Sequence, residues 1–298
     1  MKKMLFVMNP CAGLKKANRY LADILSIFNR ADYEVSVYIT EKQGDAAKIV
    51  SQQAKKLDVV VCCGGDGTFN ETMSGVLAAG VKLPIGYIPA GSTNDFANSL
   101  KLPTDVLEAA RNIVQGKPVE YDVGLFEDRY FSYVASFGAF TRASYATPQS
   151  IKNALGHTAY ILSGIQELSQ IRQIDAKLEL DGKELEGKFL FGAICNSTSV
   201  AGILTLDPSK VDMRDGQFEI LLVRSPKDLT EVAECIQAFQ NKTYDCKMVS
   251  FRSASSVKIT MDEPVDWTLD GEHQPGKKQV QITNQHLAIQ LLTKENFQ

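Results

Sequence analysis

The chain has 298 residues, which is long for one domain and sufficient for two. Hydrophobic residues make up 44% of it and charged residues 22%, and the formal net charge of -3 argues against a nucleic-acid-binding protein of the usual basic kind. No apolar run approaches the length of a membrane span, and the N-terminal MKKMLFVMNP has too few apolar residues for a signal peptide. We therefore expect a cytoplasmic protein that meets membranes only transiently, at the inner face.

Strand and helix patterns alternate over the first 116 residues. The predicted strands are Met4–Val7, Tyr33–Ile39, Val59–Cys63 and Ile85–Ile88. The predicted helices are Ala17–Phe28, Ala46–Leu57, Asn70–Leu77 and Asp105–Val114. This alternation predicts a parallel sheet with helices on both faces, in which phosphate and nucleotide sites form at the carboxyl ends of strands. Cys62 and Cys63 lie inside an apolar run and are expected to be buried thiols, as in a reducing compartment.

After about Gly116 the pattern changes to short strands separated by turns. The predicted strands are Tyr121–Leu125, Tyr130–Phe137, Ala176–Leu180, Phe189–Asn196, Phe218–Val223, Val257–Met261 and Trp267–Leu269. Asp181-Gly182 supplies the positive φ angles of a tight hairpin turn. Helices are predicted at Ile151–Arg172 and Leu229–Phe239. We therefore expect a mostly antiparallel β domain after the α/β domain.

Three loops rich in small residues follow strands of the first domain. They are NPCAG (Asn9–Gly13), GGDGTFNE (Gly64–Glu71) and PAGSTNDFA (Pro89–Ala97). Glycine lets backbone N–H groups approach a ligand closely, and a helix that starts after such a loop adds its own N-terminal N–H groups. Three loops at one sheet edge predict a phosphate cradle; the plain alternative is three sharp turns.

The second loop carries a carboxylate, Asp66, between its glycines. Neither GxxxxGK[ST] nor GxGxxG is present, so the loops are neither a P-loop nor a standard dinucleotide site. An anion here would repel phosphate unless a cation bridged them, and Mg²⁺ prefers one or two carboxylates together with phosphate oxygens and water. Asp66 therefore indicates an Mg–nucleotide complex, and Asp95 could share the metal.

These motifs resemble the bacterial diacylglycerol kinase family of lipid kinases, which is related to sphingosine and ceramide kinases and more distantly to NAD kinases and phosphofructokinases. Further motifs stand in the family's order: YDVG at Tyr121–Gly124, DGQFEILLV at Asp215–Val223 and LDGE at Leu269–Glu272. The resemblance implies a Rossmann-like, phosphofructokinase/NAD-kinase-like α/β domain over residues 1–120 and an antiparallel β-sandwich lipid-substrate domain over residues 121–286. It places the site in the cleft between them and returns residues 287–298 to the first domain, which a short strand at Leu287–Leu291 allows.

The resemblance also implies which residues bind the substrate ATP and Mg²⁺. The implied nucleotide contacts are Asn9, Pro10, Gly13, Thr40, Gly64, Gly65, Asp66, Gly67, Thr68, Asn70, Glu71, Gly91, Thr93 and Asn94. Asp66, Asp95 and Asp122 are the implied ligands of the catalytic Mg²⁺, and Asp212, Asp215 and Gln217 those of a structural Mg²⁺. The plain alternatives are a strand-end cap for Thr40, a cap or hairpin residue for Asp122, and an Asp-Gly hairpin turn for the second metal site.

LDGE is the strongest catalytic candidate in the β domain. A lipid hydroxyl has a high pKa, so a carboxylate base must accept its proton late, as the bond to phosphorus forms. Asp270 and Glu272 are the two candidates, and Glu272 is narrowly favoured; a surface Asp-Gly turn is the alternative. The chain departs from the family's usual pattern at two places. Cys11-Ala12 stands where a small or hydroxyl residue is common, and Asn98 stands where a basic residue is frequent.

We expect an ATP- and Mg²⁺-dependent kinase that phosphorylates diacylglycerol to phosphatidic acid. The alternatives are another lipid alcohol (phosphatidylglycerol, a sphingoid base or undecaprenol) or a non-catalytic nucleotide-binding regulator, and a homodimer is left open. The cluster Lys15, Lys16 and Arg19 is a solvated face or a contact for anionic headgroups. We expect the predicted helix Ile151–Arg172 to cover the β domain; the alternative is that it dips into a bilayer surface.

Overall fold

The computed structural model describes residues 1–13, 16–139, 173–200, 204–241 and 243–294. The chain divides into two compact units, Met1–Val123 with Gln285–Gln298, and Gly124–Asn284. The mixed α/β fold class is as predicted. The helix predicted at Ile151–Arg172 lies outside the described residues.

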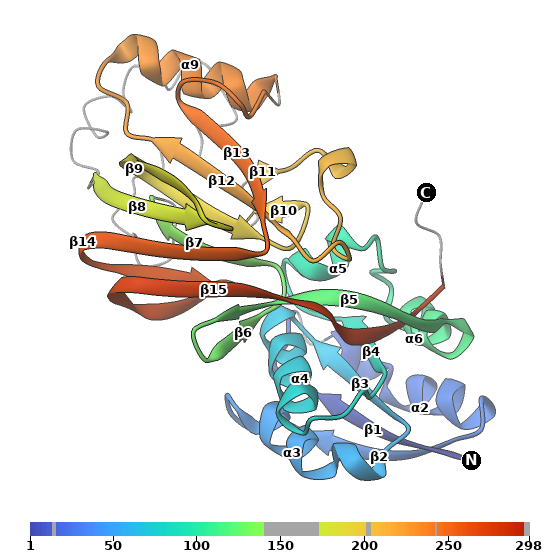
Figure 1. Ribbon diagram of the computed structural model, residues 1–298. Helices are drawn as coiled ribbons and strands as arrows, with labels where there is room; N and C mark the ends of the chain where they lie inside the picture. Colours follow the sequence, from blue (N-terminus) through green and yellow to red (C-terminus); the bar gives the residue numbers. More distant parts are fainter. Residues whose placement is uncertain (14–15, 140–172, 201–203, 242, 295–298) are drawn as a thin grey trace. The chain divides into compact units, whose positions relative to one another are not determined.

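The first unit alternates strands and helices. Its elements are β1 (Lys2–Met8), α1 (Lys16–Arg19), α2 (Leu21–Arg30), β2 (Tyr33–Ile39), α3 (Asp45–Gln53), the 3-10 turn η1 (Ala54–Lys56), β3 (Val59–Gly64), α4 (Asp66–Ala78), β4 (Ile85–Pro89), α5 (Asp95–Ser99), α6 (Val106–Gln115) and the first part of β5 (Lys117–Phe126). The strands form a parallel sheet in the order β2-β1-β3-β4, in which Met4 lies beside both Val35 and Val59. The C-terminal part of β15 (Glu272–Thr293) joins it in parallel, with Leu291 beside Ile85. The carboxyl ends of β1, β3 and β4 therefore meet at one edge (Figure 1).

Helices cover both faces of this sheet, because neighbouring residues of a strand point to opposite sides. Cys63 belongs to the cluster that includes Phe28 of α2 and Ile113 of α6. Cys62 faces α4, where it is hydrogen-bonded to Thr72. Burial raises the pKa of both thiols, that of Cys63 to about 12, so both are neutral packing groups at physiological pH.

The helices differ from the predicted ones at several places. The helix predicted over Ala17–Phe28 is interrupted at Tyr20, which separates α1 from α2. Helix α4 begins at Asp66 and not at Asn70, because an acidic residue in the first turn interacts favourably with the helix dipole. The short helix α5 lies where the sequence predicted only a loop.

The second unit is a twisted antiparallel assembly. Its elements are the end of β5, β6 (Arg129–Phe131), β7 (Val134–Gly138), β8 (Ile174–Leu180), β9 (Lys183–Cys195), β10 (Ser199–Val200), β11 (Leu204–Thr205), the 3-10 turn η4 (Pro208–Lys210), β12 (Phe218–Arg224), α9 (Leu229–Gln240), β13 (Val249–Ala254), β14 (Ser256–Leu269) and most of β15. The long strands β9 and β14 each pair with β8 through one half and with β7 through the other, so they contribute to two layers. This is the predicted β-sandwich.

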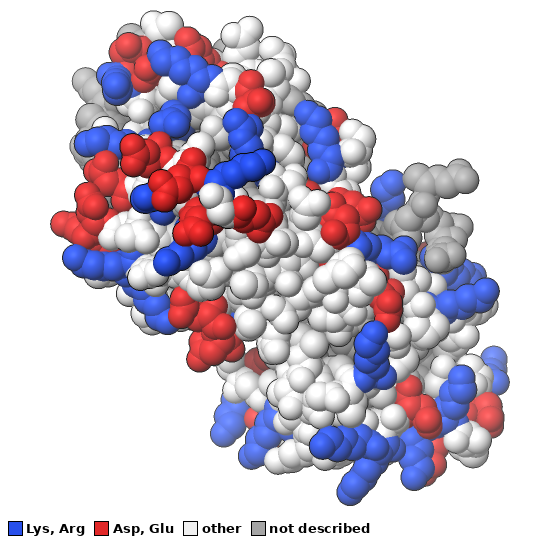
Figure 2. All heavy atoms as spheres, viewed as in Figure 1, with Lys and Arg blue, Asp and Glu red and all other residues white. Residues whose placement is uncertain are grey.

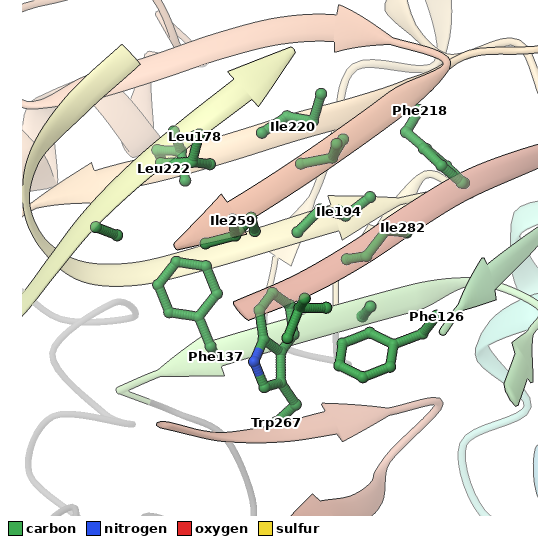
Figure 3. Close-up of a cluster of buried hydrophobic side chains, with 14 of the residues drawn as sticks. Phe126, Phe137, Leu178, Ile194, Phe218, Ile220, Leu222, Ile259, Trp267 and Ile282 are labelled. Carbon is green, nitrogen blue, oxygen red and sulfur yellow. The ribbon is translucent and has the colours of Figure 1, made fainter. Parts of the chain in front are cut away.

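Aromatic residues fill the core of the second unit (Figure 3). The Trp267 ring lies 5.0 Å from the Phe126 ring and 4.8 Å from the Phe137 ring, measured between centroids. Two predicted strands, Val257–Met261 and Trp267–Leu269, are one strand here, β14. The predicted gap falls at register shifts around Pro264, which has no N–H group to donate to a neighbouring strand.

Candidate active site

Three loop segments meet at the carboxyl edge of the first unit's sheet. Loop 1 is Asn9–Gly13, loop 2 is Gly64–Glu71 and loop 3 is Pro89–Ala97. Asn9 joins loop 1 to loop 2, since its Nδ2 donates to Thr68 Oγ1 at 3.2 Å and its backbone N–H donates to the Cys63 carbonyl at 2.9 Å. The Ala90 N–H donates to the Gly64 carbonyl at 2.8 Å and joins loop 2 to loop 3.

Glycines let these loops touch backbone to backbone. A Cβ atom at Gly91 would lie 2.6 Å from Gly65 Cα and 2.7 Å from Asn94 Oδ1, closer than non-bonded atoms approach. Gly13 has a φ of 51°, and a Cβ there would overlap the Ala90 carbonyl oxygen. Asn94 completes the packing, because its Oδ1 accepts the Gly91 N–H at 2.9 Å. The loops therefore need these glycines for their own assembly.

Asp66 is buried, with 8% of its surface exposed. Its Oδ2 accepts the Asp95 N–H at 3.0 Å and its Oδ1 accepts the Phe96 N–H at 3.2 Å, both at the start of α5. These N–H groups and the positive end of α4 offset the negative charge. A cation that bridges Asp66 and a phosphate, as the sequence predicts, stays a prediction. Each carboxylate oxygen has two lone pairs, so this arrangement is compatible with metal ligation as well.

Two residues predicted to contact ATP hold the scaffold of the site. Glu71 anchors the start of α3, since its Oε1 accepts the Gly44 N–H at 2.8 Å and its Oε2 accepts the Ala46 N–H at 3.2 Å. The Thr40 N–H and Oγ1 both donate to the Met8 carbonyl, at 2.9 and 3.4 Å. For Thr40 this geometry is the strand-end cap that the sequence left as its alternative.

The other predicted nucleotide residues lie within the loops themselves. They are Pro10, Gly64, Gly67, Asn70 and Thr93. The Thr93 carbonyl accepts Asn98 Nδ2 at 2.7 Å, so Asn98, where the family often has a basic residue, holds loop 3 in place. The Asn70 Oδ1 accepts Ser74 Oγ at 3.5 Å along α4.

Asp122 is fully buried and binds the returning strand β15. Its Oδ1 accepts the Leu287 N–H at 2.8 Å and lies 3.0 Å from His286 Nδ1. Among the residues that the structure describes, no three Asp, Glu, His or Cys side chains form a group that could hold a metal ion. Asp66, Asp95 and Asp122 therefore do not converge as three ligands of one metal, and a shared metal stays a prediction.

In the second unit, LDGE forms the two-residue turn between β14 and β15, with φ angles of 48° at Asp270 and 81° at Gly271. The Asp270 side chain points inward, with 7% of the residue exposed. Its Oδ2 accepts the Ser132 N–H at 2.6 Å and Oγ at 2.8 Å, and its Oδ1 accepts the N–H groups of Tyr133 and Val134 at 3.0 and 3.1 Å. Burial raises the pKa of the Asp270 carboxyl, and these hydrogen bonds oppose the rise by favouring the charged form.

Glu272 has different surroundings. Its side chain is 36% exposed, and its Oε2 lies 3.3 Å from Arg129 Nη2 in an ion pair. The same guanidinium donates to Gln274 Oε1 at 2.6 Å. The turn therefore presents one enclosed carboxylate and one accessible carboxylate.

The residues predicted to hold a structural Mg²⁺ form consecutive short turns. Asp212 Oδ1 accepts the Arg214 N–H at 3.0 Å, and Asp215 Oδ1 accepts the Gln217 N–H at 2.9 Å. The Gln217 carbonyl accepts Asn284 Nδ2 at 3.1 Å. This geometry is that of the Asp-Gly turn given as the alternative, and metal binding here stays a prediction.

Sequence reasoning missed the partners that position these carboxylates. Ser132 lies 138 residues from Asp270, and His286 lies 164 residues from Asp122. Neither belongs to a motif, so no local signal could have identified them. Of the predicted basic cluster, Lys15 lies outside the described residues and Arg19 is exposed. No helix among the described residues is both long and apolar enough to cross a membrane.

Comparison with known protein families gives two matches that together span most of the chain. Residues 3–126 match the diacylglycerol kinase catalytic domain. Residues 134–292 match the YegS C-terminal NAD kinase beta sandwich-like domain.

Individual proteins of known sequence or structure match over nearly the whole length. A diacylglycerol kinase from Bacillus subtilis (strain 168) is 30% identical over 92% of this chain and 90% of its own. Another, from Staphylococcus carnosus (strain TM300), is 33% identical over 91% of this chain and 89% of its own. A crystal structure of a candidate diacylglycerol kinase from Bacillus anthracis str. Sterne superimposes with a TM-score of 0.81 at 25% identity, covering 99% of this chain and 96% of that one.

Proposed function

The chain belongs to the diacylglycerol kinase family of lipid kinases, and on that premise we propose that it transfers the γ-phosphoryl group of ATP to the hydroxyl group of diacylglycerol, giving phosphatidic acid. The proposal that the chain binds ATP rests on one observation. Three glycine-containing loops are in contact at the carboxyl ends of β1, β3 and β4. Such sheet edges are where open α/β folds bind nucleotides.

The backbone of these loops suits a phosphate chain. Gly65 and Gly91 pack Cα against Cα, so no side chain stands over loop 2 or loop 3 at that point. Helix α4 begins at Asp66, and its first N–H groups have no partner within the helix. Such N–H groups, with the helix dipole, favour an anion. We assign the phosphates of ATP to this place.

Magnesium fits the site through two carboxylates at most. Asp66 lies in the first turn of α4 and accepts the backbone N–H of Asp95, so these two residues are neighbours. One or two carboxylates with phosphate oxygens and water are the ligands that Mg²⁺ takes in kinase sites. When bound, the ion would neutralise charge on the phosphates. We assign Asp122 to the support of β15.

We assign the base to the LDGE turn. The four hydrogen bonds to Asp270 fill the usual acceptor positions of a carboxylate, so a base role for Asp270 requires one of them to be given up when substrate binds. Glu272 is accessible and would have to leave Arg129. The matched variants Asp270→Asn and Glu272→Gln each replace a carboxylate by an amide of the same shape. The base is the residue whose variant folds but has a lowered kcat.

The test is transfer of radiolabelled phosphate from Mg–ATP to a panel of lipids in mixed micelles: diacylglycerol, phosphatidylglycerol, a sphingoid base and undecaprenol. We expect labelled phosphatidic acid to dominate. Labelling of another lipid in its place would overturn the acceptor, and no labelled lipid at all would overturn the kinase proposal.

Asp66→Ala tests the nucleotide site, with Asp105→Ala as its matched control. Both aspartates accept two backbone N–H groups at the start of a helix, but Asp105 caps α6, away from the loops. We expect both variants to lose stability and only Asp66→Ala to lose turnover. Equal turnover in the two folded variants would refute the role assigned to Asp66.

A further inference from the structure

A pocket of about 370 Å³ lies in the first unit, between the end of α5, helix α6 and the end of β15. Its rim carries three cationic side chains, Lys101, Arg111 and Lys294, and one acidic side chain, Glu108. None of its lining residues belongs to loops 1, 2 or 3. The pocket is therefore separate from the proposed nucleotide site.

Backbone and amide contacts hold the floor of this pocket in place. Asn112 of α6 binds the end of β15 twice, because its Oδ1 accepts the Lys294 N–H at 3.1 Å and its Nδ2 donates to Thr293 Oγ1 at 3.3 Å. On the other side the Leu102 N–H donates to the Ala97 carbonyl at 2.9 Å, which fixes the turn after α5. Figure 1 shows the end of β15 running beside α6.

The described residues give this pocket an excess of positive charge, three cationic side chains against the one carboxylate of Glu108. Within the described part of the chain, Lys101, Arg111 and Lys294 form no ion pair with a carboxylate, whereas Lys82, in the same unit, pairs with Glu120 at 3.0 Å. Acidic and basic side chains are interspersed over the face that Figure 2 draws, and the whole chain carries a net charge of -3. A local excess of positive charge around a pre-formed pocket favours an anionic ligand.

We propose that this pocket binds a phosphate group, carried either by an anionic phospholipid at the membrane surface or by a free phosphate ion. A guanidinium binds two phosphate oxygens at once, and lysine ammonium groups add point charges around them. The Asn112 amide supplies a neutral polar group at the floor. The Thr293 hydroxyl is already used, because it donates to the Lys294 carbonyl at 3.3 Å. Helix α5 connects the pocket to loop 3, because its first residues bind Asp66 and its C-terminal turn leads to Lys101.

The test compares the double variant Arg111→Gln/Lys294→Gln with the control Lys55→Gln/Lys56→Gln. Both remove two exposed positive charges from the first unit, but the control lysines lie in η1, outside the pocket. The first arm measures binding of inorganic phosphate by calorimetry. The second arm measures co-sedimentation with phosphatidylcholine vesicles that contain phosphatidylglycerol, against vesicles of phosphatidylcholine alone, without ATP.

We expect the pocket variant to bind at least about tenfold more weakly than the control in one of the two arms, since each basic residue near an anionic surface contributes severalfold to binding. If the pocket variant binds anionic vesicles more weakly than the control, the ligand is a lipid headgroup. If only its binding of inorganic phosphate is weaker, the ligand is free phosphate. Glu108→Gln removes the acidic side chain and should strengthen the same binding, a gain that misfolding cannot produce. Equal binding by the pocket variant and the control in both arms would overturn the proposal.

Discussion

The LDGE turn offers a sharp test of what burial does to a carboxylate. In Asp270→Asn an amide nitrogen replaces one oxygen, so one half of the side chain becomes a donor. The favourable orientation places Nδ2 toward Ser132, whose Oγ can turn to accept, but the Ser132 N–H is then left facing a donor. The remaining acceptor is also neutral and binds the N–H groups of Tyr133 and Val134 more weakly.

The magnitude follows from these four bonds. One orphaned buried N–H and the weakening of two charge-assisted hydrogen bonds cost about 2–4 kcal/mol. Removal of the charge offsets part of this cost, because burial disfavours the charged carboxylate and raises its pKa, so we expect a net loss of about 2 kcal/mol. The second unit has the size at which this net loss lowers the midpoint of thermal unfolding by about 4–8 °C. Backbone strain does not enter, because Asn adopts positive φ as readily as Asp.

The second unit contains its own control. Asp181 begins the turn between β8 and β9 with a φ of 46°, and its carboxylate accepts the Ser255 N–H and Oγ and the Ser256 N–H. This arrangement is similar to that of Asp270, with three hydrogen bonds in place of four, but Asp181 is exposed. Water can replace a lost acceptor there, so Asp181→Asn should cost about 1 kcal/mol or less.

Urea and thermal unfolding, followed by circular dichroism, measure both variants. The reasoning is refuted if Asp181→Asn costs as much as Asp270→Asn, since burial would then not be the cause.

Four further predictions follow from the contacts of the site. Glu71→Gln should lower stability by about 1–2 kcal/mol, as loss of a helix cap does, and leave the KM for ATP unchanged. A raised KM with unchanged stability would instead support the predicted nucleotide contact of Glu71. Gly91→Ala should cost about 1–3 kcal/mol through overlap with Gly65, and unfolding at wild-type temperature would contradict the contact of the two loops. Glu272→Gln should leave the free energy of unfolding within about 0.5 kcal/mol of wild type, because its ion pair is exposed, so any fall in kcat reports on chemistry. Backbone N–H groups lower the pKa of Asp45 from 3.8, so its carboxylate stabilises the fold above that value. This contribution is lost as the pH falls through the folded-state pKa. The difference in unfolding midpoint between wild type and Asp45→Asn should therefore stay constant above about pH 4 and shrink below it.

Local sequence patterns were sufficient to predict many of the strands, helices and turns. The continuous apolar run Val59–Cys63 and the helical spacing of Asp105–Val114 both form the predicted elements, since a strand covered on both faces is apolar throughout and a helix buried on one face repeats its apolar residues every three to four positions. The Asp181-Gly182 turn forms because its residues tolerate positive φ. Predictions failed where an element depended on its neighbours: β14 continues through the irregularity at Pro264 because β15 lies beside it.

The amino-acid sequence by itself determined the order of strands and helices, the three glycine loops and the family, because these depend on the spacing of residue types along the chain. The tertiary structure decided what the carboxylates of those motifs touch. Asp66 meets the start of α5, Asp122 meets β15, and Asp270 meets the segment before β7. Each partner is distant in sequence, and a buried carboxylate must find donors wherever the fold brings N–H groups to it.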